Sequence, residues 1–495
     1  MSMDNSESHN SLLPDDIIEP LFAVSGTSNL KNALEYLIET AKTCDGRLDL
    51  ASKHILVPVL ELCQYPFKLP AEYLLLSLKL LRNLCAGEIK NQNLFIEQKG
   101  VETLSILVSS LGQNFGSDNG LLPMVLQLLG NVSLAGEQHR SVVWLRFFPH
   151  KFLDIAKVRS KETCDPLCMV IYTCCAGSYE QSAELFAELG QHILVEIIQT
   201  ITIAGFKQVW VKLLLSNICI EEPYFSSIFS KLPRAVETWS SDENASQVHH
   251  FGAEKSFFLS ILSEILSEQV GDIVISNDFP LCIFEVFKNA VGIADLSTAG
   301  NSPLPTGSAD IDTIGYTLSI LRDTSACDRK VSNQDEEQDT VDLLVRAGLI
   351  KFLIDLLHEL EPPAIIRKAM INNDAKNKTI SRHYKYRCPY RGFRRDIVSI
   401  LGNCSYGKKH VQDEIRERNG ILVLLQNCVI DDDNPFLREW GVWSMRNILE
   451  GNMENQQLVA DLELQNSVDS PDIAQLGLRV EVDPRTRRPK LVNAS

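Results

Sequence analysis

Apolar residues recur along this chain in blocks that have helical spacing and end with a polar residue at a fixed phase. The polar residues that close these blocks, called marks below, are Asn83, Asn131, Thr173, Asn217, Asn403 and Asn447. Adjacent marks from Asn83 to Asn217, and again from Asn403 to Asn447, lie about 42 to 48 residues apart, which is typical of three-helix armadillo-type repeats. The pattern therefore predicts a helical repeat protein.

The order of elements within one repeat is clearest after Asn83. Residues 91–99 predict a short first helix, Gly100 a left-handed stop, 101–111 a second helix, and 121–132 a third helix that ends at the next mark. Each repeat leaves an apolar face that only its neighbours can cover. We therefore expect stacking between repeats to supply the stability.

These patterns predict an all-α protein, an armadillo-like right-handed superhelical solenoid of roughly eight to ten degenerate repeats. Less regular repeats close at Glu39, Glu264 and Asp323. The expected organisation is repeats over 1–360 with a flexible insertion at 292–312, a basic insertion at 361–391, further repeats at 392–466, and an extended basic tail at 467–495.

Composition narrows the class of partner and compartment. The chain has 495 residues, is 45% hydrophobic and carries a formal net charge of −17. This charge disfavours non-specific binding to nucleic acid or anionic membranes and favours a basic partner. Thirteen scattered cysteines indicate free thiols, and the polar start lacks a leader pattern. We expect a cytosolic protein without membrane insertion.

Several motifs near the C-terminus belong together. They cover residues 392–403, Asn419 to Ile421, 430–440 and 446–456. In this order they resemble the C-terminal domain of ataxin-10, over roughly residues 390–462. The resemblance implies a cytoplasmic armadillo-like scaffold without catalytic residues, connected through protein partners with cell division, cytokinesis and cell growth or differentiation.

The same motif also predicts a helix start. Asn434 suits the N-cap and Pro435 the first helical position, with the acidic residues 431–433 beside the positive end of the helix dipole. We interpret the acidic run first as a helix-start device.

One stripe of the predicted helix combines aromatic residues with the last mark. Trp443 and Asn447 have the Trp-x-x-x-Asn spacing with which peptide-binding armadillo proteins hold extended ligands, but the other marks lack the tryptophan. The alternative is that each asparagine bonds the backbone of a neighbouring repeat. The candidate partner-binding residues are Phe436, Arg438, Trp440, Trp443, Asn447 and Asn403.

The basic insertion suggests a second class of function. Its cations alternate with aromatic residues, as in proteins that bind RNA or single-stranded DNA. The candidates are Arg382, Lys385, Arg387, Arg391, Arg394 and Arg395. A solvated loop, a contact to an acidic protein, or a cover over the chain's own acidic surface would explain the same residues. Nucleic acid is the less favoured partner.

No pattern in the chain predicts an enzyme, a cofactor or a metal site. We find no phosphate-binding loop, dinucleotide fingerprint or nucleophile elbow. Cys164, Cys168, Cys174 and Cys175 lack the spacing of zinc ligands and are expected to pack as small apolar side chains. The leading function is a non-enzymatic scaffold for other proteins. The sequence leaves their identity, and self-association, open.

Overall fold

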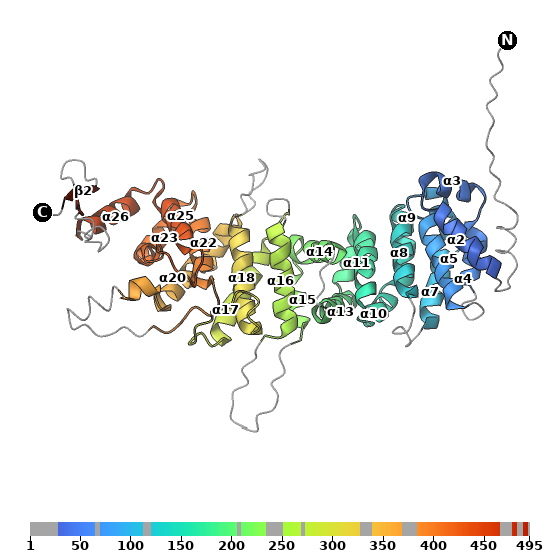
Figure 1. Cartoon of the computed structure of the whole chain (residues 1–495), viewed down its shortest axis with the longest axis horizontal. Helices are drawn as coiled ribbons and strands as arrows, with labels where there is room; N and C mark the ends of the chain where they lie inside the picture. The colour runs from blue at the N-terminus through green and yellow to red at the C-terminus, as the bar shows by residue number, and fades with distance from the viewer. Residues whose placement is uncertain are drawn as a thin grey trace, which may run out of the picture. The chain divides into compact units, whose positions relative to one another are not determined.

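The computed structural model describes residues 28–64, 70–111, 120–204, 209–233, 251–268, 273–326, 339–368, 384–465, 478–482 and 489–493. Contacts divide the chain into two compact units, Met1–Pro233 and Arg234–Ser495 (Figure 1).

The described part of the first unit is helical throughout. Its elements are α2 (Ser28–Thr40), α3 (Cys44–Ser52), α4 (Leu56–Cys63), α5 (Ala71–Leu84), α6 (Ile89–Glu97), α7 (Gly100–Leu111), α8 (Leu121–Ser133), α9 (Glu137–Phe147), α10 (His150–Ala156), α11 (Lys161–Cys175), α12 (Tyr179–Phe186), α13 (Glu188–Ala204), α14 (Val209–Leu215), the π-helix η2 (Ser216–Glu221) and α15 (Phe225–Lys231). The third helices α2, α5, α8, α11 and α14 pack one against the next.

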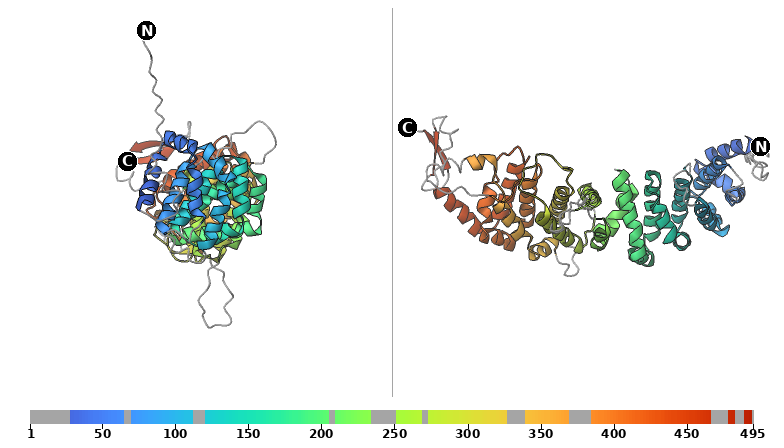
Figure 2. Two further views of the ribbon diagram at one scale, coloured as in Figure 1. Left: turned by 90° about the vertical axis from the view of Figure 1, so that its right-hand side faces the viewer. Right: turned by 90° about the horizontal axis from the view of Figure 1, so that it is seen from below.

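The second unit repeats this arrangement and ends in a hairpin. Its helices are α16 (Ala253–Glu268), α17 (Asp278–Ile293), α18 (Ala309–Ala326), α19 (Thr340–Arg346), α20 (Leu349–Glu359), α22 (Phe393–Ser405), α23 (Lys409–Glu417), α24 (Gly420–Leu425), α25 (Leu437–Leu449) and α26 (Met453–Gln465). Here α16, α18, α22 and α25 form the row of third helices. In both units, helices that follow each other in the row lie side by side (Figure 2). The predicted all-α solenoid of armadillo-like repeats is confirmed.

The tail predicted to be extended contains two strands. Strands β1 (Leu478–Val482) and β2 (Pro489–Asn493) pair antiparallel, with Leu478 opposite Asn493. This pair is the only sheet in the described part of the chain.

The core of each unit runs along the row of third helices. In α8, for example, Leu122, Val125, Leu126 and Leu129 are fully buried. Full burial of one such side chain contributes about 1.5–3 kcal/mol. The predicted cysteine cluster at residues 164–175 is buried, and all cysteines of the described residues are free. No helix in the described ranges is long and apolar enough to cross a membrane.

The mark residues join consecutive third helices. The side-chain amide of Asn131 donates to the backbone oxygen of Arg82 (2.9 Å), and that of Asn403 to the oxygen of Arg322 (3.1 Å). Asn447 donates in the same way to Gly402 (3.0 Å). The interpretation that these asparagines bond the backbone of a neighbouring repeat is confirmed at these positions. Such bonds satisfy buried polar groups.

Glutamine side chains nine residues after Asn83 and after Asn403 cap third helices. Gln92 on the first helix α6 donates to the oxygens of Cys85 (3.0 Å) and Asn131 (2.8 Å). Its counterpart Gln412 on α23 donates to Ser405 (3.3 Å) and Asn447 (2.8 Å). The last carbonyls of a helix have no partner within the helix. One glutamine therefore satisfies the ends of two successive third helices.

Two helix-boundary predictions are wrong. The left-handed residue after α6 is Lys99 (φ 56°), whereas Gly100 opens α7. Glycine is needed at position 100 because a Cβ there would lie 2.5 Å from the ring of Phe95. Asn434 is not the N-cap of α25, which begins at Leu437. Its Oδ1 instead accepts from the backbone N–H of Arg394 (2.9 Å), at the start of α22.

The Gly-, Ser- and Pro-rich insertion lies between α17 and α18 and is tied to the end of the basic insertion. Backbone N–H groups of Arg387 and Arg391 donate to the oxygens of Leu296 (2.8 Å) and Ser302 (2.9 Å), and the Gly300 N–H donates to Cys388 (2.9 Å). These bonds fix the entry to α22, the third helix that follows.

Replacing Gln412 by alanine tests the capping role. The change leaves buried carbonyl groups of two third helices without donors, so we expect the free energy of unfolding to fall by about 1–3 kcal/mol. Urea denaturation, with hydrogen exchange to locate the loss in the second unit, measures this. Gln457→Ala on the exposed face of α26 is the control, with an expected change within about 0.5 kcal/mol. Equal effects of the two substitutions would contradict the capping role.

Candidate protein-binding surface

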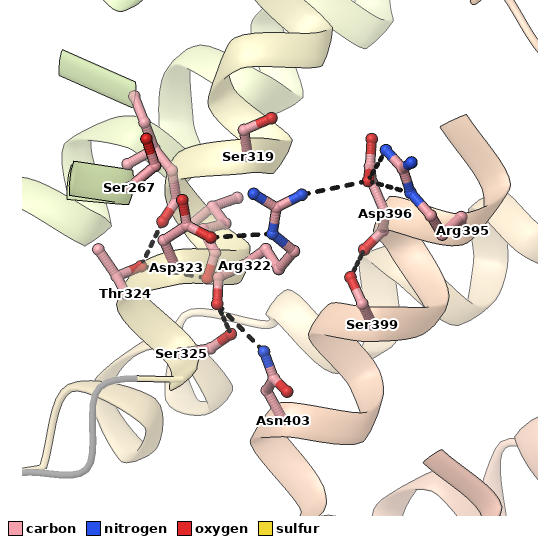
Figure 3. A network of polar contacts seen from close by, with 12 residues as sticks. Ser267, Ser319, Arg322, Asp323, Thr324, Ser325, Arg395, Asp396, Ser399 and Asn403 are labelled. Atoms are coloured by element: carbon pink, nitrogen blue, oxygen red, sulfur yellow. Dashed lines mark hydrogen bonds and ion pairs between the residues drawn. The ribbon is translucent and has the colours of Figure 1, made fainter. Parts of the chain in front are cut away.

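A network of charged groups lies where α18 meets α22 (Figure 3). The Asp396 carboxylate is 1% exposed and accepts from Nη2 of Arg395 (2.7 Å) and from the hydroxyl of Tyr390 (2.8 Å). Nη1 of Arg322 on α18 reaches the same carboxylate at 3.5 Å, while its Nε bonds Asp323 (2.9 Å). Burial, followed by the adjacent Asp396, raises the pKa of Tyr390, so its hydroxyl stays a donor. The network closes the gap between two third helices with paired charges.

The outer face of α25 presents aromatic side chains to solvent. Phe436 is 69% exposed and Trp443 is 46% exposed, whereas Trp440 is half-buried. The Arg446 guanidinium stacks over the Trp443 ring at 5.0 Å from its centroid. Together with Arg438, these residues are called the α25 surface below. Exposed apolar groups of this size on a folded protein commonly mark a binding site.

Equivalent positions in the preceding repeats are covered. Counting back from the mark, Trp443 and Arg446 correspond to Ser399 and Gly402 of α22, which are both buried. The covering element is α25, because a Cβ on Gly402 would lie 2.3 Å from Oγ of Ser444. Likewise a Cβ on Gly130 of α8 would lie 2.1 Å from Met169 of α11. The residue just before each mark thus faces the next third helix, and no third helix follows α25 in the described residues.

In other third helices an arginine just before the mark binds a side-chain oxygen of the next third helix. Arg82 of α5 donates to Oε1 of Gln127 on α8 (2.9 Å), and Arg322 of α18 reaches Asp396 on α22. Arg446 occupies the same place on α25, where its guanidinium lies over the ring of Trp443. The α25 surface is therefore the open end of a row of stacked helices. Its cation, Arg446, stands at a position where the arginines of α5 and α18 bind a side-chain oxygen of the next third helix.

Two of the predicted partner-binding residues point away from solvent. Asn447 is buried and bonded to Gly402, so the prediction that it contacts a partner is wrong. Asn403 is half-buried, and its side-chain amide donates to the backbone oxygen of Arg322. The period that marks these asparagines arises from repeat stacking. Phe436 directly precedes α25, and Arg438, Trp440 and Trp443 lie on it.

The basic insertion does not form one exposed surface. Arg394 is 2% exposed, so the prediction that it contacts nucleic acid is wrong. Arg395 pairs with Asp396, and Lys385 lies 3.6 Å from Glu359. Arg387 lies 3.7 Å from Glu361.

Arg391 is exposed and donates to the backbone of Asp432, and Arg382 lies outside the described residues. Among the alternatives, a cover over the chain's own acidic groups fits these contacts. Within the described residues no cluster of ligating side chains could hold a metal ion.

Some residues of this region escaped the sequence analysis. Arg322 and Asp396 are far apart in sequence, and their pairing depends on the stacking of α18 and α22. Gln92 and Gln412, by contrast, could have been found, because both lie nine residues after a mark.

The structure defines the class of protein: an α-solenoid of armadillo-type repeats. The family model described as "Spinocerebellar ataxia type 10 protein domain" matches residues 393–491. Human ataxin-10 is 25% identical over 362 residues, which cover 72% of this chain and 68% of the relative. The Xenopus tropicalis ataxin-10 is 24% identical over 432 residues, or 84% and 79% of the two chains.

Over 92 residues, 19% of this chain and 15% of the relative, an ataxin-10 homolog of Dictyostelium discoideum is 41% identical. These matches support the ataxin-10 family. The match to the family model reaches beyond residue 462, the limit suggested by the motifs, into the segment of the hairpin.

Two engineered proteins are similar among solved structures. A designed armadillo repeat protein in complex with the peptide (KR)4 gives a TM-score of 0.33 at 14% identity and covers 52% of this chain and 99% of its own. Another engineered protein gives 0.35 at 13% identity and covers 92% and 95%.

Substituting Asp396 by asparagine tests the network in Figure 3. The variant keeps the shape but leaves the guanidinium groups of Arg322 and Arg395 without their shared buried carboxylate. We expect a loss of about 2–4 kcal/mol in the free energy of unfolding of the second unit, measured by urea denaturation. Glu417→Gln, on the exposed side of α23, should change it by less than about 0.5 kcal/mol. A stable Asp396→Asn variant would show that the network adds nothing to stacking.

Proposed function

We propose that this protein is a non-enzymatic scaffold that binds a helix of another protein on the α25 surface. The observation that supports this proposal is the open end of the row of third helices. Trp443 and Arg446 are exposed there, although the corresponding positions of α22 are covered. By its family, the protein acts in the cytoplasm in cell division and in cell growth or differentiation.

The contacts between successive third helices indicate which kind of partner would fit the α25 surface. On third helices that precede α25, the positions equivalent to Trp443 and Arg446 face the next third helix. An arginine just before the mark bonds an amide or carboxylate oxygen of that neighbour. We therefore expect the partner to present an amphipathic helix with apolar residues against Trp443 and Phe436 and a carboxylate or amide against Arg446.

Exposed Phe436 and half-buried Trp440 enlarge the surface that such a helix can cover. Aromatic residues and arginine are enriched among the residues that dominate binding energy. The Arg446 guanidinium already lies over the Trp443 ring. Less side-chain freedom is lost when a partner binds a pair that is ordered beforehand.

The double variant Trp443→Ser plus Arg446→Glu tests the surface. Serine is the residue that α22 carries at the first position, and both side chains are exposed, so folding should be unaffected. We expect affinity for the partner to fall about 100-fold or more, because two central contacts are lost and one charge is reversed. Quantitative co-purification from cells, followed by calorimetry with the purified partner, measures this loss.

The control is Ile106→Ser, which removes an exposed apolar side chain from α7 of the first unit. Binding should survive this change. Converting the partner's acidic residue to lysine should restore binding to Arg446→Glu. Partners that persist in the double variant would contradict the proposal. The same holds if the lost partner is a second copy of the chain, detected as a change in mass by light scattering.

A further inference from the structure

A cavity of about 200 Å³ lies in the second unit, on the second helices α20 and α24 rather than on the third helices. Its lining includes Leu357 and His358 of α20, Leu422 of α24, and the polar residues Gln426, Asn427 and Arg394. Asn427 and Arg394 are buried, whereas Leu422 and Asn419 are exposed. The cavity thus runs from solvent to a buried cation.

Arg394 has incomplete contacts for a buried charge. Its Nη1 donates to Oδ1 of Asn427 (3.3 Å) and its Nη2 to the backbone oxygen of Glu361, but its buried Nε has no partner. No carboxylate of the described residues lies within ion-pair distance of it: Glu361 pairs through its side chain with Arg367 and Arg387.

Burial lowers the pKa of Arg394 from its ordinary value, yet a guanidinium remains charged at neutral pH. The carboxylates of Asp431 and Glu361 act on this charge without forming an ion pair with it. A buried charge that lacks a direct ion pair is costly. Asn427, the backbone of Glu361 and the Cys388 thiol contact the guanidinium, and its Nε–H is left without a partner.

We propose that this cavity binds a small oxyanion, a phosphate or carboxylate group, against the guanidinium of Arg394. The anion supplies a directly paired counter-charge and accepts from the Nε–H of Arg394 that has no partner. Guanidinium groups bind both phosphate and carboxylate through parallel hydrogen bonds. His358 and Gln426 lie on the lining as further polar groups.

The size of the cavity limits the ligand. A volume of about 200 Å³ admits a free ion or a single acidic or phosphorylated side chain, but not a polymer backbone. The proposal therefore differs from binding of nucleic acid by the basic insertion. It is also independent of the α25 surface, whose residues do not line the cavity.

Calorimetric titration of the full chain tests this site. One arm uses inorganic phosphate and the other a short peptide that carries one phosphoserine, each against chloride at matched ionic strength. We expect saturable phosphate binding that is absent with chloride. If the peptide binds more tightly than the ion, the group is borne by a peptide; if not, it is a free ion. Either result supports the site.

Two variants locate the binding. Arg394→Met should weaken it by about tenfold or more, since a charge-assisted hydrogen bond is lost. Leu422→Trp fills the exposed end of the cavity without changing a core residue. If Arg394→Met does not fold, the loss of phosphate binding in Leu422→Trp tests the site instead. Ile430→Trp, exposed and outside the lining, is the matched control and should bind normally. Absence of binding in both arms, or unchanged binding in both cavity variants, would overturn the proposal.

Discussion

Hydrogen bonds between the side chains of one repeat and the backbone of the next are the interaction on which this structure depends. The amides of Asn131, Asn403 and Asn447 each reach the backbone of the preceding third helix. Gln412 then joins the ends of two third helices. Apolar burial drives the stacking but is not directional, whereas these bonds fix how far each helix slides along its neighbour. The position of each repeat is thereby set by its contacts with the neighbouring repeats.

Among the described residues α25 is the last helix of its row, and the side chains on its open face differ from those at the same positions of α22. On α22 the positions that face the next helix carry Ser399 and Gly402, which allow close approach. On α25 they carry Trp443 and Arg446, which are too large for the same close contact and remain in solvent. The last repeat is therefore suited to a partner that packs at a greater distance than its own neighbours do. That difference is the physical basis for placing the function at this end.

Local patterns in the sequence predicted the repeats, and tertiary contacts decided what was missed. The period of the marks and the apolar faces identified the third helices, because each lies within one helix. Asn434 looked like a cap for the helix that follows it, but it caps α22, which precedes it in the chain. Arg394 read as part of an exposed basic run, yet Asn427 and the backbone of Glu361 enclose it. Trp443 is exposed because no third helix follows α25 in the described residues, and no local pattern in the sequence records this.

Site-specific photo-crosslinking measures the central claim most directly. A photoreactive amino acid in place of Trp443 would be compared in cells with one in place of Ile106, which is also exposed. The account predicts that position 443 crosslinks to a helix of another protein that carries an acidic or amide side chain, and that position 106 does not. Equal crosslinking from the two positions, or none from 443 in cells where the partner is present, would contradict it.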